Sequence, residues 1–319
     1  MKILITGAHG FVGPHLVATL RRQFGDDVEI LSTSRMKGVD PVLGTVETLD
    51  VTDARAVYQT IRRVRPSHVV HLAGLAAIRV VIADTSTAWQ VHLFGTLNIA
   101  NALLEHAPDC VLVFIGSGQV YGASARSALA LDETAMLAPT NGYEVTKAAA
   151  DLALGALVTQ GLRCLRLRPF NHTGPGQTED FVVPSFAMQI ARIEAGGRPP
   201  IIQVGNLEAE RDFLDVRDVT AAYALAIARS DDLASGTILN VASGVPRRIS
   251  DILDRLVALS TMAITVQQDP TRMRPSDTPR FVGSASRAQA LLGWAPRYDF
   301  DDTLAEILAY SRRVVSTSA

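Results

Sequence analysis

A tyrosine and a lysine four residues apart are the pair in this sequence with the clearest chemistry. Tyr143 and Lys147 lie in the run Asn-Gly-Tyr-Glu-Val-Thr-Lys, which reads as the start of a helix, so their side chains share one face. A free tyrosine has a pKa of about 10, and the Lys147 ammonium is expected to lower it. Ser117 ends an apolar stretch that is predicted to be a strand. The three residues are therefore predicted to handle the proton of a carbonyl/alcohol couple, with Ser117 hydrogen-bonding the oxygen.

A glycine-rich turn near the start of the chain is the second chemical signal. In Thr-Gly-Ala-His-Gly-Phe-Val-Gly, Gly7 permits a tight turn, Gly10 lets the backbone approach a pyrophosphate, and Gly13 lets the helix pack closely. Free backbone N–H groups and the helix dipole then face the anion. This turn predicts a dinucleotide cofactor, and three further candidate contacts within it are His9, Phe11 and Val12.

The stretch after the second expected strand bears on the choice of cofactor. It reads Leu-Ser-Thr-Ser-Arg and holds no acidic residue to bind a ribose 2′-hydroxyl. Ser34 and Arg35 are instead expected to meet a 2′-phosphate, with Arg35 as a bidentate donor. NADPH is therefore favoured, with NADH possible. Asp50 is expected either to accept from the adenine amino group or to cap the next helix.

Alternating strands and helices must position these residues. Strands of four to six apolar residues separated by helices predict a parallel sheet covered on both faces. The expected strands are residues 3–6, 28–33, 46–49, 68–72, 110–115 and 163–167. The expected helices are residues 11–24, 52–64 with Thr52 as the cap, 89–106 and 143–160.

From about Asn171 the rhythm changes to loops rich in glycine and proline. Three segments are expected to return to regular structure: residues 218–229, 238–241 and 249–259. We therefore expect a dinucleotide-binding domain over residues 1–170, with returning segments at about 214–242. Residues 171–319 are expected to form mainly a substrate-binding region.

The composition narrows the class of protein. The 319 residues include 48% hydrophobic and 19% charged residues, with a net charge of −2 and no long charged run. Neither a nucleic acid nor a membrane is expected as a partner. The start of the chain and the lack of a long apolar run predict a cytoplasmic enzyme. Cys110 and Cys164 are expected to be buried free thiols. The histidines show no metal-like clustering, so no metal is expected, and His68 and His71 are predicted to be structural.

Taken together, these motifs resemble the extended short-chain dehydrogenases/reductases over nearly the whole chain. The resemblance is carried by TGAHGFVG, HLAG at 71–74, SGQVYG at 117–122, YEVTK and RPFNHTGPGQ. It implies an α/β, Rossmann-type doubly wound parallel sheet with a smaller interleaved C-terminal substrate-binding region. It also implies that Ser117, Tyr143 and Lys147 act together while the nicotinamide supplies hydride. The further cofactor contacts that it implies are Val51, Leu72, Ala73, Gly74 and Phe170.

Two positions depart from the pattern of that family. His92 stands where asparagine is frequent, and Gly74 stands where alanine is usual. Neither change removes a catalytic group, and His92 is expected to affect local helix contacts or a water path. Nucleotide-sugar dehydratases of the superfamily carry an acid in the strip where this chain has Gln119. An amide is no general acid or base, so dehydration is not expected.

The second half resembles the GDP-4-keto-6-deoxy-D-mannose reductases. The similar runs are RPFNHTGPGQ, FVVPSF, VGNLEA, RDF with DVRD, and RPSD. The resemblance implies a GDP-sugar whose diphosphate Arg211 and Arg274 neutralise and whose ribose Asp277 binds. Arg217 is expected to pair with Asp215 or Asp218 instead. The full set of candidate substrate contacts is Ser117, Gly118, Gln119, Asn171, Val182, Val183, Gly205, Asn206, Arg211, Arg274 and Asp277.

The leading hypothesis is NADPH-dependent reduction of the C4 ketone of GDP-4-dehydro-6-deoxy-D-mannose to GDP-6-deoxy-D-mannose (GDP-D-rhamnose). Hydride delivery to the other face would give GDP-6-deoxy-D-talose. An epimerase with tightly held NAD would use the same Ser117, Tyr143 and Lys147. A cofactor-binding redox sensor without turnover is the alternative from another class. The family resemblance also implies a homodimer formed by helices 89–106 and 143–160, whose alanines permit close approach.

Overall fold

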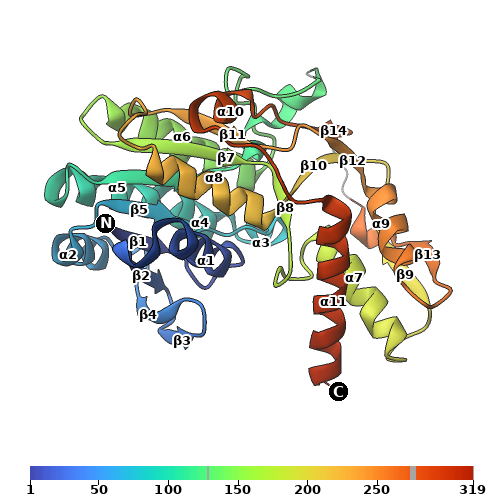
Figure 1. Cartoon of the computed structure of the whole chain (residues 1–319). Helices are drawn as coiled ribbons and strands as arrows, with labels where there is room; N and C mark the ends of the chain where they lie inside the picture. The colour runs from blue at the N-terminus through green and yellow to red at the C-terminus, as the bar shows by residue number, and fades with distance from the viewer. Residues whose placement is uncertain (128, 274–277, 319) are drawn as a thin grey trace.

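A large, mostly parallel sheet forms the body of the protein (Figure 1). The computed structural model describes residues 1–127, 129–273 and 278–318. The eight strands are ordered β11-β7-β6-β5-β1-β2-β4-β3, and only the edge strand β3 runs antiparallel to its neighbour. Their bounds are β1 (Lys2–Thr6), β2 (Glu29–Ser34), β3 (Gly38–Asp40), β4 (Gly44–Thr48), β5 (His68–His71), β6 (Val111–Ile115), β7 (Cys164–Pro169) and β11 (Ile238–Val241).

Helices cover both faces of this sheet, as near-continuous apolar strands such as β6 require. One face packs against α1 (Val12–Phe24), α8 (Val216–Ala228) and α10 (Ser286–Leu292). The other face packs against α2 (Ala54–Val64), α5 (Gly95–His106) and α6 (Gly142–Val158). The predicted Rossmann-type doubly wound sheet is confirmed.

The strand order places a topological switch point at the carboxyl ends of β1 and β5, where open α/β sheets form a binding crevice. The chain leaves β1 for β2 on one side, and β5 returns on the other side of β1. Ligands of open α/β sheets bind at such a switch point. Gly7 after β1 and Ala73 after β5 approach so closely that a Cβ on Gly7 would lie 2.6 Å from the Ala73 Cα. The glycine turn therefore opens directly onto this crevice.

The rest of the chain builds two smaller sheets beside the main one. A four-stranded sheet contains β8 (Asn171–Thr173), β10 (Glu210–Asp215), β12 (Pro246–Arg248) and β14 (Arg280–Phe281). A two-stranded sheet joins β9 (Ile201–Val204) to β13 (Thr265–Gln268). A second apolar core lies among α7 (Val182–Glu194), α9 (Ile249–Ala258) and α11 (Phe300–Ser318). Figure 1 shows these helices on the right, with α11 alongside α7.

Several local predictions are wrong in detail. The single helix expected over residues 89–106 is α4 (Thr85–Trp89), a π-helix (Gln90–Phe94) and α5. Asp53 caps α2 instead of Thr52, because its side chain accepts from the Ala56 N–H at 3.0 Å. The remaining short helices are η1 (Gly25–Asp27), α3 (Ile78–Ala83), η3 (Gly118–Arg126) and η4 (Pro270–Arg272).

Two predictions about buried and membrane-spanning segments can be compared with the structure. Cys110 and Cys164 are buried free thiols, as predicted. In the described part of the chain, no helix is both long and apolar enough to cross a bilayer.

Candidate active site

Ser117, Tyr143 and Lys147 gather at the carboxyl end of β6, beside the crevice. Ser117 follows β6 and caps η3, while Tyr143 and Lys147 lie in the first turns of α6. The Ser117 hydroxyl accepts from the Gln119 N–H at 3.1 Å and is hydrogen-bonded to Tyr143. The Lys147 ammonium donates to the Ile115 carbonyl at 3.2 Å. The structure thus brings together the three residues that the sequence singled out.

The start of α6 is fixed by its own capping groups. The Asn141 side chain accepts from the Glu144 N–H at 3.0 Å. The Glu144 carboxylate in turn accepts from the Thr140 N–H at 2.6 Å and from the Thr140 hydroxyl. The first bond satisfies the Glu144 N–H, a helix N–H group that would otherwise lack a partner, and the others fasten Thr140, just before the cap, to the first turn. These capping hydrogen bonds fix the first turn of α6 and thereby the position of Tyr143.

A buried ion pair fixes the middle of α6 against the sheet. Asp151, which is fully buried, accepts from Arg168 through two hydrogen bonds of 2.9 Å and from Arg166 at 3.1 Å. Arg168 also donates to the Tyr121 hydroxyl at 3.0 Å, and that hydroxyl donates to Asn240 at 2.7 Å. The catalytic helix is therefore joined to β7 by the buried pair of Asp151 and Arg168, with the partly exposed Arg166 beside it.

The protonation of the catalytic pair differs from the sequence-based expectation. Burial raises the pKa of Tyr143 above its ordinary value, and the hydrogen bond with Ser117 offsets only part of this rise. Burial also lowers the pKa of Lys147 to about 8. The expected lowering of the Tyr143 pKa is wrong for the protein alone, because desolvation of the phenolate, with a smaller contribution from the Glu144 carboxylate, outweighs the hydrogen bond with Ser117. Tyr143 is consequently a protonated phenol, which is the form that a proton donor needs.

The glycine turn fits the pyrophosphate of a dinucleotide. Gly7 has a φ of +71°, and a Cβ on Gly13 would lie 1.8 Å from the Ala8 carbonyl oxygen, so neither position accepts another residue without a shift. α1 begins at Val12 with no side-chain cap and no acidic residue in its first turn. No side chain therefore competes with an anion for the start of α1 and its positive dipole end, although the Gly13 N–H donates to the Gly10 carbonyl.

The candidate contacts for the adenosine end of the cofactor lie along β2 and β4. Ser34 ends β2, and Arg35 after it is exposed. Lys37, two residues later, is also exposed and adds a second positive charge to this end of β2. The sequence-based prediction missed Lys37, although the basic run Ser-Arg-Met-Lys could have indicated it. His9 lies beside β3, since a Cβ on Gly38 would be 3.2 Å from its ring.

Of the other cofactor candidates, Asp50 is hydrogen-bonded near the start of α2, whereas Val51 and Phe170 are buried. The Asp50 carboxylate accepts from the Thr52 N–H at 2.9 Å and from its hydroxyl, so the alternative that Asp50 caps α2 is wrong. Val51 is buried against Gly95, and the Phe170 ring is buried with Tyr121 and Phe281.

The loop after β5 lies next to the catalytic lysine. The Leu72 N–H donates to the Thr6 carbonyl at 3.1 Å, and Ala73 abuts Gly7. A Cβ on Gly74 would lie 3.3 Å from the Lys147 ammonium nitrogen. Leu72, Ala73 and Gly74 therefore follow the crevice from the glycine turn to the proton-transfer residues.

The candidate substrate contacts come from several separate elements. Gly118 and Gln119 begin η3, Asn171 begins β8, and Val182 and Val183 begin α7. A Cβ on Gly118 would lie 2.8 Å from the Phe170 ring, so this glycine permits the close packing of the strand end against that ring.

The candidates for the nucleotide end lie farther along the second half of the chain. Gly205 and Asn206 follow β9, and a Cβ on Gly205 would lie 2.5 Å from the Arg272 carbonyl oxygen. Arg211 lies in β10 and donates to the Thr278 carbonyl at 2.8 Å. Arg274 and Asp277 lie outside the described residues. The predicted pairing of Arg217 with Asp215 is confirmed by a contact of 2.7 Å.

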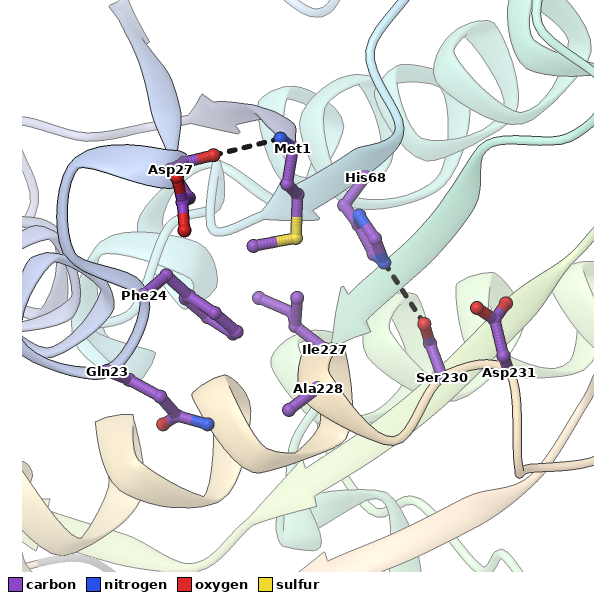
Figure 2. A pocket seen from close by; sticks show the side chains of 9 residues that line it. All are labelled: Met1, Gln23, Phe24, Asp27, His68, Ile227, Ala228, Ser230 and Asp231. Carbon is purple, nitrogen blue, oxygen red and sulfur yellow. Dashed lines mark hydrogen bonds between the residues drawn. The ribbon is translucent and has the colours of Figure 1, made fainter.

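A separate hollow of about 450 Å³ lies at the other end of the strands (Figure 2). Its lining includes Met1, Phe24, Ile227 and His68, the first residue of β5. In Figure 2 the His68 ring points toward Ser230, to which it is hydrogen-bonded at 3.0 Å. None of the catalytic or cofactor candidates line this hollow, so it is distinct from the candidate active site.

Known proteins place the chain in a family. The family model described as GDP-mannose 4,6 dehydratase matches residues 4–307, and the chain belongs to this family of extended short-chain dehydrogenases/reductases. GDP-6-deoxy-D-mannose reductase of Pseudomonas aeruginosa is 34% identical over 309 residues, covering 97% of this chain and 96% of that protein.

Two further comparisons agree with this placement. GDP-6-deoxy-D-talose 4-dehydrogenase of Aggregatibacter actinomycetemcomitans is 27% identical over 304 residues, with 92% of each chain covered. The structure of RMD from Pseudomonas aeruginosa complexed with NADPH matches with a TM-score of 0.86 and 32% identity, covering 98% of this chain and 99% of that one. The resemblance found in the motifs is therefore confirmed across the whole fold.

Proposed function

We propose that this protein reduces the C4 ketone of GDP-4-dehydro-6-deoxy-D-mannose with NADPH, giving GDP-6-deoxy-D-mannose. One observation carries the proposal: a buried Ser117–Tyr143–Lys147 set beside a dinucleotide turn, in a chain 34% identical to a GDP-6-deoxy-D-mannose reductase. The glycine turn and the uncapped start of α1 fit the cofactor's pyrophosphate. The similarity to an NADPH-bound structure supports the choice of cofactor.

The roles of the catalytic residues follow from their protonation and hydrogen bonds. Bound NADPH supplies the hydride that reduces the ketone carbon. Tyr143, held as a neutral phenol, donates its proton to the oxygen as the C–O double bond becomes a single bond. Ser117 hydrogen-bonds the same oxygen and orients it toward Tyr143. Lys147 supplies positive charge that stabilises the phenolate left after proton donation.

Gln119 argues against dehydration, although the matched family model is named for a dehydratase. The side chain lies at the start of η3, next to Ser117. An amide neither takes up nor releases a proton near neutral pH, so it cannot remove water from the sugar. In the proposed reaction the sugar is therefore dehydrated before it reaches this enzyme, and it binds as a 4-keto-6-deoxy sugar.

Recognition of the nucleotide is assigned to residues of the second half. Arg211 and Arg274 carry the positive charge proposed to meet the diphosphate, and Asp277 is proposed to accept from the ribose hydroxyls. The loop at Gly205 and Asn206 is proposed to face guanine.

The direct test supplies GDP-4-dehydro-6-deoxy-D-mannose and follows the absorbance of NADPH, then identifies the sugar by NMR. We expect NADPH oxidation and GDP-6-deoxy-D-mannose as the product. A talose product would keep the reaction class but reverse the face of hydride attack. This outcome is included because the relative from Aggregatibacter is a GDP-6-deoxy-D-talose 4-dehydrogenase. Turnover with UDP- or dTDP-sugars and none with the GDP-sugar would refute the proposed nucleotide.

Arg35 is expected to distinguish the two nicotinamide cofactors. Its exposed guanidinium follows β2, where it is placed to pair with a 2′-phosphate. Arg35→Ala should raise the KM for NADPH by about 10- to 100-fold, because one charge-assisted contact contributes roughly 1.5–3 kcal/mol. The KM for NADH should change little. Equal changes for both cofactors, measured by steady-state kinetics, would show that Arg35 does not read the phosphate.

We also propose that the enzyme is a homodimer that pairs through α5 and α6. Large apolar side chains on and beside these helices are exposed, namely Phe94, Val145 and Leu152. Leu152→Glu is expected to convert a dimer to a monomer in sedimentation velocity, because it places a charge in an apolar interface. Leu291→Glu, on exposed α10, is the matched control and should leave the dimer intact. A monomeric wild-type protein would contradict this arrangement.

A further inference from the structure

A series of buried hydrogen bonds connects β1 to the catalytic helix. The Thr6 hydroxyl is bonded to His71 Nδ1 at 2.7 Å, and His71 Nε2 is bonded to the Thr96 hydroxyl at 3.1 Å. That hydroxyl donates to the His92 carbonyl at 2.6 Å. The His92 ring continues the series to Thr146 on α6. We call these five residues the buried chain; each is at most 2% exposed.

The His92 ring lies where two parts of the active site meet. Its Nε2 accepts from the Leu75 N–H at 2.9 Å. Leu75 comes directly after Leu72, Ala73 and Gly74, the residues that follow the crevice. Its Nδ1 is bonded to the Thr146 hydroxyl at 2.9 Å. Thr146 in turn donates to the carbonyl of Gly142 or Tyr143, at 2.9 and 3.0 Å. The loop after β5 and the first turn of α6 therefore share one imidazole.

The hydrogen bonds fix the position of every proton in the buried chain. Because Leu75 donates to Nε2 of His92, the ring proton is on Nδ1 and is donated to Thr146. The Thr96 hydroxyl uses its only proton to donate to the His92 carbonyl, so the hydroxyl oxygen must accept from His71 Nε2. The ring proton of His71 is therefore on Nε2. The two histidines thus hold opposite tautomers.

Both rings are neutral. Burial lowers the pKa of His71 and of His92 to about 3, and the nearby Lys147 cation adds to each shift. A proton on Nε2 of His92 would also point at the N–H of Leu75, which is itself a donor. Lys147 therefore remains the cation beside Tyr143, without a second charge from His92.

The local geometry directs the effect of His92 onto the proton donor. The His92 and Tyr143 rings meet edge to face, with centroids 5.7 Å apart. His92 lies in the π-helix (Gln90–Phe94), a distortion that often marks functional sites. The distorted turn and the ring contact both place His92 against the side of the catalytic helix that carries Tyr143.

We propose that His92 is a positioning residue that, through Thr146 and Leu75, sets Tyr143 at a fixed place relative to the cofactor crevice. The proposal rests on the proposed ketone reduction, since it assigns to His92 an effect on that step. His92 does not contact the substrate in this view. It acts by fixing the position of α6, which carries the proton donor, relative to the loop beside Lys147.

Two single variants and their combination test the proposal. His92→Phe keeps an aromatic ring against Tyr143 but removes both ring hydrogen bonds, and Thr146→Val keeps the shape of the side chain but removes its hydroxyl. Each is expected to lower kcat by about 10- to 100-fold, because displacement of a reacting group by about 1 Å costs up to that much. The KM values for NADPH and for the GDP-sugar should change less than about threefold. The double variant should be no slower than the slower single variant, because both changes break the same connection.

A matched control separates positioning from simple loss of stability. Thr19 on α1 makes a comparable buried hydrogen bond with Thr220 at 3.0 Å, away from the catalytic residues. Thr19→Val should lower the melting temperature to a similar extent and leave kcat unchanged. If His92→Phe melts earlier but keeps the wild-type kcat, His92 is structural only and the proposal fails. Independent, multiplying losses in the double variant would also overturn it.

An NMR measurement tests the geometry without relying on activity. In the ¹⁵N-labelled wild-type protein, the His92 ring should report a proton on Nδ1 alone and the His71 ring a proton on Nε2 alone, with neither titrating between pH 5 and pH 8. Loss of signals in His92→Phe assigns the ring. The opposite tautomer or a charged ring at His92 would refute the hydrogen-bond directions assigned to the buried chain and, with them, the proposed role of His92. Correct tautomers with no turnover of the GDP-sugar by the wild-type enzyme would instead refute the proposed function.

Discussion

Tyr143→Phe is expected to lower kcat for the ketone reduction by about 10²- to 10⁴-fold, the range that a positioned general acid contributes. The phenol is the proton donor, and its removal leaves the reduced oxygen without a partner at the moment when charge develops. The ring itself is retained, so its contact with His92 and the fold of α6 should persist. The rate is measured as single-turnover oxidation of NADPH at saturating substrate.

Binding provides the control for that prediction. The Kd of NADPH, followed by fluorescence, should change by less than about threefold, because Tyr143 adds only one polar contact of modest net strength. A variant that lost activity together with cofactor binding would show that Tyr143 acts mainly in binding. A variant that kept the wild-type rate would exclude Tyr143 as the proton donor. Binding of NADPH by the wild-type protein without any oxidation of NADPH would instead favour a redox-sensing protein over an enzyme.

Asp151→Asn is expected to lower the free energy of unfolding by about 3–5 kcal/mol, as is typical when one partner of a buried ion pair is removed. Asp151 is fully buried and accepts from two arginines, of which Arg168 has a side chain only 3% exposed. The substitution nearly preserves shape but leaves those two guanidinium charges without their counter-charge. Urea unfolding measures the loss, with the slope of the transition serving as a check on two-state behaviour.

A surface pair of similar geometry is the matched control. Arg163 and Asp231 approach to 2.8 Å, but their side chains are 39% and 89% exposed. Asp231→Asn should therefore leave the midpoint of urea unfolding nearly unchanged, since water and salt screen exposed pairs. Equal losses for the two variants would mean that burial of Asp151 does not set the strength of its interactions.

The alternation of strands and helices made much of the main sheet predictable. Apolar strands such as β6 are buried on both faces and form continuous hydrophobic runs, which are typical of a parallel sheet covered by helices on both sides. The glycine spacing identified the turn because Gly7 and Gly13 meet backbone atoms that exclude a side chain. Tyr143 and Lys147 were predictable for a similar reason, since helical spacing alone places them on one face.

Other features depend on contacts between distant segments. The π-helix (Gln90–Phe94) interrupts a segment whose periodicity favoured one long helix, and within it the His92 ring is hydrogen-bonded to Leu75 and Thr146, which are distant in sequence. The pKa of Tyr143 was mispredicted because burial is a property of the folded chain and not of the Tyr-x-x-x-Lys spacing. The edge strand β3 is only three residues long and gave no apolar run to recognise.

Asp151 and Thr146 connect α6 to different parts of the main sheet. Asp151 joins it to β7, and the buried chain through Thr146 joins it to β5 and β1. The candidate contacts for the sugar nucleotide lie mostly elsewhere, on β8, α7, the loop after β9 and β10. Substitutions in those elements would leave both anchors of α6 in place. Changing which nucleotide sugar is accepted, by directed evolution or by exchange of segments between relatives, should therefore require few compensating changes around the proton-transfer residues on α6.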